Sequence, residues 1–130
     1  MTMRKRLAAA AAVLALGGGL ATFPASPAAA AYTCHLSVRT GWGYAGYYSG
    51  VTVQPSSSGV SNAGIEAQCL LKAYGYSPGT IDGVFGPNSR AKAKLFQQHM
   101  NLAFDAGLDE DGKVGKDTWP WLRTMSARGI

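Results

Sequence analysis

One short phrase of the sequence is written twice. Residues 82–89 read DGVFGPNS and residues 111–118 read DGKVGKDT, so the second copy begins 29 residues after the first. Both follow the pattern Asp-Gly, any residue, a bulky apolar residue, Gly, two further residues, and Ser or Thr. Asp-Gly favours a tight turn with a positive φ at the glycine. We therefore predict two equivalent turns, each of which buries its apolar residue (Phe85 or Val114), reverses the chain closely at the next glycine and starts a helix.

The end of each phrase predicts where a helix begins. The last two residues are NS in the first copy and DT in the second, and such side chains cap helix amino termini. Proline is tolerated only in the first helical turn, so Pro120 favours Asp117 as the cap and itself takes the third helical position. The equivalent cap in the first copy is Asn88. We expect one helix from 87 or 88 to 100 and another from about 118 to 127.

A further amphipathic helix precedes the first turn. Ser61 or Asn62 can cap it, and apolar residues spaced i, i+3, i+4 and i+7 between 67 and 74 form one face. Gly75 predicts a stop in the left-handed conformation. Cys69 lies almost opposite the main apolar face, on a second and thinner apolar strip.

Residues 1–31 have the pattern of a secretory signal peptide that is removed. A basic stretch at 4–6 is followed by an apolar run at 7–20 and by alanines before Tyr32, where cleavage is expected, there or one residue earlier. The apolar run is shorter than the roughly 20 residues that span a membrane. The residues before Cys34 do not fit a lipidation motif, so we expect no membrane attachment after cleavage.

The charge of the remaining chain argues against a nucleic-acid partner. The full sequence has a formal net charge of +5, but three of its basic residues lie at 4–6. Residues 32–130 keep nine basic and seven acidic residues, a net charge of +2. No dense basic stripe is left, and export places the chain outside the cell.

Two units are expected in the mature chain. Residues 32–59 are rich in Gly, Tyr and Ser, and alternating stretches at 36–38 and 51–53 predict two short strands. Residues 60–130 form the helical unit. The serine-rich stretch 55–59 reads as the linker between them.

The sequence contains two cysteines, Cys34 and Cys69. An even number of cysteines in a small exported domain predicts a disulfide rather than free thiols. The bridge would close a loop of 35 residues and stabilise the fold by roughly 3–4 kcal/mol in the loop-entropy model. It would also place the aromatic unit across the back of the first helix, leaving the main core to the helical unit.

Five motifs in the helical unit resemble a known family. The stretch AQCLLKAYGYSPGTIDGVFGPNSRAKAKLFQQ, followed by DGKVGKDTWPWL, looks like the peptidoglycan-binding module of bacterial cell-wall hydrolases. The family pattern runs from a Gln-containing helix that ends in Gly-Tyr, through Asp-Gly-x-Phe-Gly and a helix ending in Phe-Gln, to Asp-Gly-x-Val-Gly-x-x-Thr-Trp. These motifs correspond here to Gln68, Gly75-Tyr76, 82–86, Phe96-Gln97 and 111–119.

The resemblance implies a fold, a partner and a location. The expected fold is mainly α, a compact three-helix domain over residues 60–130, preceded by a short extended or β segment. The implied activity is noncovalent binding of peptidoglycan, through its glycan strand or its stem peptide, by a secreted protein associated with the cell wall. The module usually accompanies an enzyme domain, but the roughly 28 residues outside it here cannot house one.

No catalytic or metal site is expected, and no cofactor. The two histidines, His35 and His99, do not supply the roughly three converging ligands of a zinc site, and His99 is expected to favour the dipole at the end of its helix. The acidic run before the second turn lacks the spacing of a calcium loop. Asp82 and Asp111 could suggest a glycosidase pair, but the two turns explain their equivalent positions, and nothing in the sequence places their carboxyl groups near each other.

Candidate ligand contacts cluster around the first turn: Tyr76, Asp82, Phe85, Ser89, Arg90 and Gln97. Structural roles compete with binding for most of them. Phe85 suits the core, Asp82 and Ser89 suit a turn and a cap, and Tyr76 can fold back over the end of the first helix. Arg90 and Gln97 are expected to be the exposed contacts.

Two alternatives remain open at this stage. The aromatic residues Trp42, Tyr44, Tyr47 and Tyr48 could stack on sugars, although packing against the first helix is favoured. The scaffold could also serve as an extracellular interaction or regulatory partner of a separate cell-wall hydrolase, with weak binding to the wall itself. A small wall-active enzyme is the least favoured interpretation.

Overall fold

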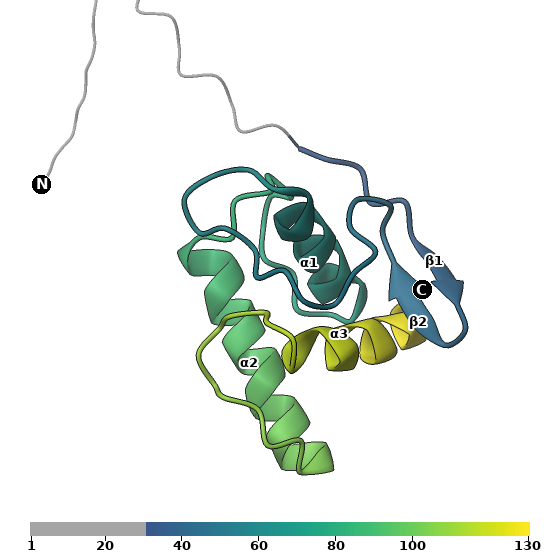
Figure 1. Cartoon of the computed structure of the whole chain (residues 1–130), viewed down its shortest axis with the longest axis vertical. Coiled ribbons are helices and arrows are strands. Elements are labelled where there is room, and N and C mark those ends of the chain that lie inside the picture. The colour runs from purple at the N-terminus through teal and green to yellow at the C-terminus, as the bar shows by residue number, and fades with distance from the viewer. Residues whose placement is uncertain (1–30) are drawn as a thin grey trace, which may run out of the picture.

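The computed structural model describes residues 31–130, and the predicted signal peptide lies almost wholly outside them. In the described part, three helices follow a two-stranded hairpin (Figure 1), which confirms the expected mainly α fold. The elements are β1 (Ser37–Arg39), β2 (Trp42–Tyr44), α1 (Asn62–Ala73), α2 (Pro87–Phe104), α3 (Thr118–Ser126) and a closing 3-10 turn, η2 (Ala127–Gly129). No helix among the described residues is long and apolar enough to cross a membrane.

Helix α1 begins and ends as its sequence predicts. Of the two candidate caps, Ser61 is the one used, and its hydroxyl accepts a hydrogen bond from the Gly64 N–H at 3.0 Å. Gly75 takes a φ of +100° after the helix. The Tyr76 N–H then donates to the Leu71 carbonyl at 2.8 Å, which closes the last turn.

Helix α2 differs from the prediction at both ends. Its N-cap is Gly86, so Asn88 lies inside the helix and does not cap it. Proline at the first helical position needs no backbone partner, so Pro87 can start the helix without a side-chain cap. The helix also continues one turn past Met100 to Phe104, and its C-cap Asp105 has a φ of +52°. Asn101 explains this extension, because its side chain exchanges hydrogen bonds with both backbone groups of Leu108 and folds the following loop onto the helix.

Helix α3 starts where Pro120 predicts. Asp117 is the N-cap and Pro120 takes the third helical position, although the Asp117 side chain makes no capping hydrogen bond. The chain end beyond α3 lies against the hairpin (Figure 1). It also packs on α1, because a Cβ added at Gly129 would collide with the Ala73 carbonyl.

The hairpin confirms one expected strand and corrects the other. β1 contains Val38, but it pairs with β2 and not with the stretch around 51–53, which forms no strand. A two-residue turn joins the strands, with positive φ at Thr40 (52°) and Gly41 (81°). This geometry matches the twist of the strands and makes the nearer partner, β2, the favoured one.

The helical core is built around both turns. Phe85 and Val114 are buried at 2% and 0% exposure, as their equivalent places in the two phrases predict. They join buried residues from all three helices: Leu70, Leu71, Phe96, Met100, Trp119 and Leu122.

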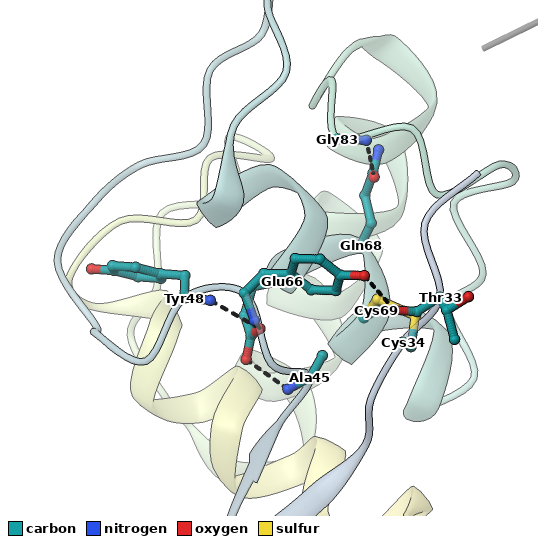
Figure 2. The surroundings of a disulfide bond; sticks show 9 residues. Thr33, Cys34, Ala45, Tyr48, Glu66, Gln68, Cys69 and Gly83 are labelled. Atoms are coloured by element: carbon teal, nitrogen blue, oxygen red, sulfur yellow. Dashed lines mark hydrogen bonds between the residues drawn. A yellow bond between two sulfur atoms is a disulfide. The ribbon is translucent and has the colours of Figure 1, made fainter. Parts of the chain in front are cut away.

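The aromatic unit lies on the back of α1, as predicted. A disulfide joins Cys34 to the buried Cys69, with their Cα atoms 5.6 Å apart (Figure 2). The unit does more than cover α1, however. Its β2 strand also packs against α3, and the Trp119 indole N–H donates to the Val53 carbonyl at 2.8 Å. The helical unit therefore does not form the core alone.

A buried ion pair between α1 and α3 holds the aromatic unit against both helices, and no local sequence pattern predicts it. Glu66 of α1 and Arg123 of α3 are fully buried, with an N–O distance of 2.9 Å. The Glu66 carboxylate also accepts the backbone N–H groups of Ala45, Tyr47 and Tyr48 (Figure 2 shows two of these bonds). The Arg123 guanidinium donates to three carbonyls of the aromatic unit: Gly43, Tyr48 and Gly50. Backbone groups of the aromatic unit thereby satisfy the remaining hydrogen-bonding capacity of both charges.

Candidate functional site

The first turn is held by one side chain of α1. Gln68 is buried, and its Oε1 accepts the Gly83 N–H at 2.8 Å (Figure 2). Its Nε2 donates to Asp82 Oδ1 (2.9 Å), the Val84 carbonyl (3.0 Å) and Ser89 Oγ (2.9 Å). An amide NH₂ carries two hydrogens, so the three acceptors share them. One glutamine thus fixes the beginning, middle and end of the phrase.

The second turn is held in the same way by α2. Gln97 Oε1 accepts the Gly112 N–H at 2.8 Å. Its Nε2 donates to Asp111 Oδ1 (3.2 Å), the Lys113 carbonyl (3.0 Å) and Thr118 Oγ1 (3.1 Å). Every partner lies 29 residues after its counterpart in the first turn, and so does the glutamine. The repeated unit is therefore a helix glutamine together with the turn that it anchors.

Each turn also closes on itself. Asp82 Oδ1 accepts the Val84 N–H at 3.0 Å, and Asp111 Oδ1 accepts the Lys113 N–H at 2.9 Å. The glycine that follows each aspartate has a positive φ, 80° at Gly83 and 73° at Gly112. The aspartates are thus turn-forming groups.

Two details of the predicted turns are wrong. Ser89 and Thr118 do not cap their helices, because their hydroxyls face the anchoring glutamines. The later glycines, Gly86 and Gly115, do not bring the chain into a close approach, since an added Cβ would meet nothing within 4 Å at either position.

A hollow opens at the surface of the first turn. It has a volume of about 300 Å³. Its walls carry hydrogen-bonding side chains beside two prolines, and they include Pro78, Thr80, Asp82, Pro87, Asn88 and Ser89. Asp82 is the only ionisable residue among the lining side chains. Such a site suits a ligand rich in hydroxyl and amide groups.

A second hollow of about 210 Å³ lies over the second turn. It has Gln97 where the first has Gln68, and Thr118 where the first has Ser89. Its rim differs, because Lys113, Lys116 and Asp117 replace uncharged residues.

The structure brings together only some of the predicted contacts. Asp82 and Ser89 line the first hollow, whereas Gln97 belongs to the second. Gln97 is 1% exposed, so the expectation of an exposed contact is wrong for this residue. Phe85 belongs to the core, and Arg90 is half-buried at the start of α2.

Tyr76 lies apart from the first hollow. Its ring packs near Tyr74 and Phe96, and its hydroxyl is 2.9 Å from His99 Nδ1. Burial, with Tyr74 close by, raises the pKa of the Tyr76 phenol. His99 therefore has a tyrosine partner, and the longer α2 removes it from the last helical turn, where a role at the helix dipole was expected.

The aromatic residues of the first unit mainly serve packing. The Tyr48 ring lies 5.2 Å from that of Trp119, and its hydroxyl accepts the N–H groups of Thr52 and Val53. The Arg123 guanidinium lies 4.4 Å from the centre of the Tyr44 ring. These contacts favour the packing interpretation.

Sequence reasoning missed Gln68, Thr80 and Asn88 as candidate site residues. The signal for Gln68 was available, because Gln68 and Gln97 are separated by the same 29 residues as the two phrases. Nothing in the sequence marked Thr80, which lies outside the repeated pattern. Among the described residues, no group of three or more His, Cys, Asp or Glu side chains is placed to hold a metal ion.

Comparison with known families agrees with this geometry. The model of a putative peptidoglycan binding domain matches residues 61–122. These residues belong to the peptidoglycan-binding domain family. The match begins at the cap of α1 and ends within α3, so it contains both anchored turns. No solved structure matches the chain with significance. The aromatic unit and the disulfide half-cystine Cys34 lie outside the matched residues.

Proposed function

We propose that this protein is a secreted, noncatalytic binder of bacterial cell-wall peptidoglycan, and that the hollow over the first turn is its binding site. The family match over residues 61–122 carries the proposal. The match includes every residue that lines this hollow.

The chemistry of the hollow supports this ligand. Peptidoglycan offers hydroxyl and acetamido groups on its sugars and amide groups on its stem peptides. The hydroxyl of Thr80, the amide of Asn88 and the carboxylate of Asp82 can pair with such groups, and the prolines provide apolar contact. Arg90, which follows Ser89 in α2, stays a candidate contact for a stem-peptide carboxylate.

The aspartates support a noncatalytic role. A glycosidase needs two carboxyl groups that flank one scissile bond. Asp82 and Asp111 line different hollows, and each already accepts hydrogen bonds from its own turn and glutamine.

The disulfide supports the secreted part of the proposal, because disulfides form and persist in oxidising compartments outside the cytosol.

A sedimentation assay tests the proposal. Purified residues 32–130, with the disulfide formed, are incubated with washed sacculi and centrifuged. Pelleting of the protein with intact sacculi is the expected result. Failure to pellet would reject the proposal and favour a role as a partner of a separate cell-wall hydrolase. Release of soluble muropeptides would reveal an enzyme and exclude both.

A further inference from the structure

The two hollows are related by the repeat, but their surroundings differ. The anchoring glutamine, aspartate and hydroxyl recur in both at a spacing of 29 residues. The second hollow has a neighbouring trough of about 470 Å³, whose lining also includes Lys116 and Asp117. The trough is lined by Leu108, Pro120 and Trp121, among others.

Trp121 gives the trough an aromatic wall. Phe104 stacks against the indole, with ring centroids 5.6 Å apart and planes at 30°, and is itself 43% exposed. The residue at the equivalent place in the first copy, 29 positions earlier, is Lys92. The aromatic wall therefore belongs to the second copy alone and does not follow from the repeated turn.

We propose that the second hollow and the adjoining trough form a second subsite, which holds a sugar ring of the wall glycan on Trp121. This inference rests on the proposed binding of peptidoglycan. It adds a second point of attachment and assigns it to the glycan rather than to the stem peptide.

The arrangement of groups favours a sugar. A pyranose ring has an apolar C–H face, which packs on aromatic rings, and a polar edge that needs donors and acceptors. Trp121 provides an aromatic surface for the apolar face of the ring, and the adjacent Lys116 and Asp117 provide a donor and an acceptor for its polar edge. These two side chains are 76% and 79% exposed and pair with each other at 3.2 Å, so they are accessible and their charges offset each other.

Two linked contacts would also bind the wall more strongly than one. Both subsites lie on the same rigid domain, so binding at the first raises the effective concentration of neighbouring glycan at the second. A modest affinity at each subsite is then sufficient for attachment to an insoluble polymer.

The test uses a soluble tetramer of N-acetylglucosamine, which carries the ring and acetamido groups of wall glycan without stem peptide. Nuclear magnetic resonance follows the indole N–H signals of residues 32–130 during titration. The signal of Trp121 should shift, while that of Trp119, bonded to Val53, should stay in place. Trp121→Ala should weaken binding of the tetramer at least tenfold, and Trp121→Phe should restore most of it.

Lys92→Ala, at the equivalent place in the first copy, is the matched control and should bind the tetramer as the wild type does. Since Trp121 is half-buried, the exposed variant Lys116→Ala guards against a folding defect and should weaken binding about threefold. The inference is overturned if sacculi still pellet the wild type but the tetramer leaves Trp121 unmoved, or if a stem tripeptide shifts it instead. If the wild type does not pellet at all, the proposed function itself fails.

Discussion

Gln68 and Gln97 show how much of this fold depends on single polar side chains. Each is buried and forms four hydrogen bonds to its turn. A buried backbone group without a partner costs about 1–3 kcal/mol. The glutamine therefore stabilises the turn largely because its absence would leave several groups unsatisfied at once.

Replacing Gln97 tests this dependence. We expect Gln97→Ala to lower the free energy of unfolding by about 2–4 kcal/mol, because the Gly112 N–H and the Lys113 carbonyl lose their partner. Urea denaturation at 25 °C measures the change. The neighbouring Gln98→Ala is the control, since the Gln98 side chain makes none of these bonds. Equal stabilities for the two variants would show that the anchor is unimportant.

The two glycines of the second turn differ in a testable way. An alanine at Gly112 would have an unfavourable φ of +73° and a Cβ 2.5 Å from the Arg90 carbonyl oxygen. We therefore expect Gly112→Ala to lower the free energy of unfolding by about 1–3 kcal/mol. Gly115→Ala meets open space, so its thermal unfolding midpoint should be close to that of the wild type. A smaller effect at Gly112 than at Gly115 would contradict the turn geometry.

At the scale of elements, the Glu66–Arg123 pair is one of the contacts that bind the aromatic unit to the helices. Both side chains are fully buried and bond to backbone groups of the aromatic unit. Removing one partner of such a pair leaves an uncompensated charge in the interior, which costs about 3–5 kcal/mol. An exposed pair contributes little by comparison.

The described residues contain one buried ion pair, Glu66–Arg123, and one exposed pair, Lys116–Asp117, which can be compared directly. Glu66→Gln should lower the free energy of unfolding by about 3–5 kcal/mol. Asp117→Asn, which breaks the exposed pair with Lys116, should change it by less than about 1 kcal/mol. Urea denaturation followed by circular dichroism compares them. A similar, small loss in both variants would mean that the buried pair does not hold the units together.

The elements could be predicted from sequence where the signal is local. The ends of α1, the start of α3 and the burial of Phe85 and Val114 follow from caps, proline and the repeated phrase. The long-range contacts could not be predicted. The partner of Glu66 lies 57 residues away, and nothing in the local pattern marks either residue as buried. The second strand was expected at 51–53 from the alternation of its valines, whereas β1 pairs with β2 (Trp42–Tyr44).

In the candidate site, too, local motifs predict some residues, whereas others depend on long-range contacts. Asp82 and Ser89 could be placed at the first turn from the phrase itself. Gln97 was expected to be an exposed contact, but it is buried, because it anchors a turn 15 residues further along the chain. The hollows form between segments, so their walls follow from the fold and not from any single motif.

At the scale of the whole molecule, the disulfide joins a small aromatic unit to a helical domain of the peptidoglycan-binding family. The family match does not include the aromatic unit. Nevertheless, Ala45 of that unit is fully buried, and the Trp119 indole N–H donates a hydrogen bond to the Val53 carbonyl. The two units therefore share one core, and we expect them to unfold together.

Reduction of the disulfide tests this coupling. The bridge spans 35 residues, so its loss should lower the free energy of unfolding by roughly 3–4 kcal/mol. A double Cys34→Ala, Cys69→Ala variant should match the reduced protein in urea denaturation and still show a single transition. Two separate transitions in the oxidised protein would indicate that the units fold independently.

The measurement that tests the central claim most directly is the affinity for intact sacculi when the first hollow is filled. Thr80 is exposed and lines this hollow, so Thr80→Trp should block it without disturbing the core. Ser37→Trp places the same bulk on the exposed strand β1, away from both hollows. In a sedimentation assay, Thr80→Trp should weaken binding at least tenfold, or about 1.4 kcal/mol, while Ser37→Trp should bind as the wild type does. Wild-type affinity in a folded Thr80→Trp variant would contradict the account.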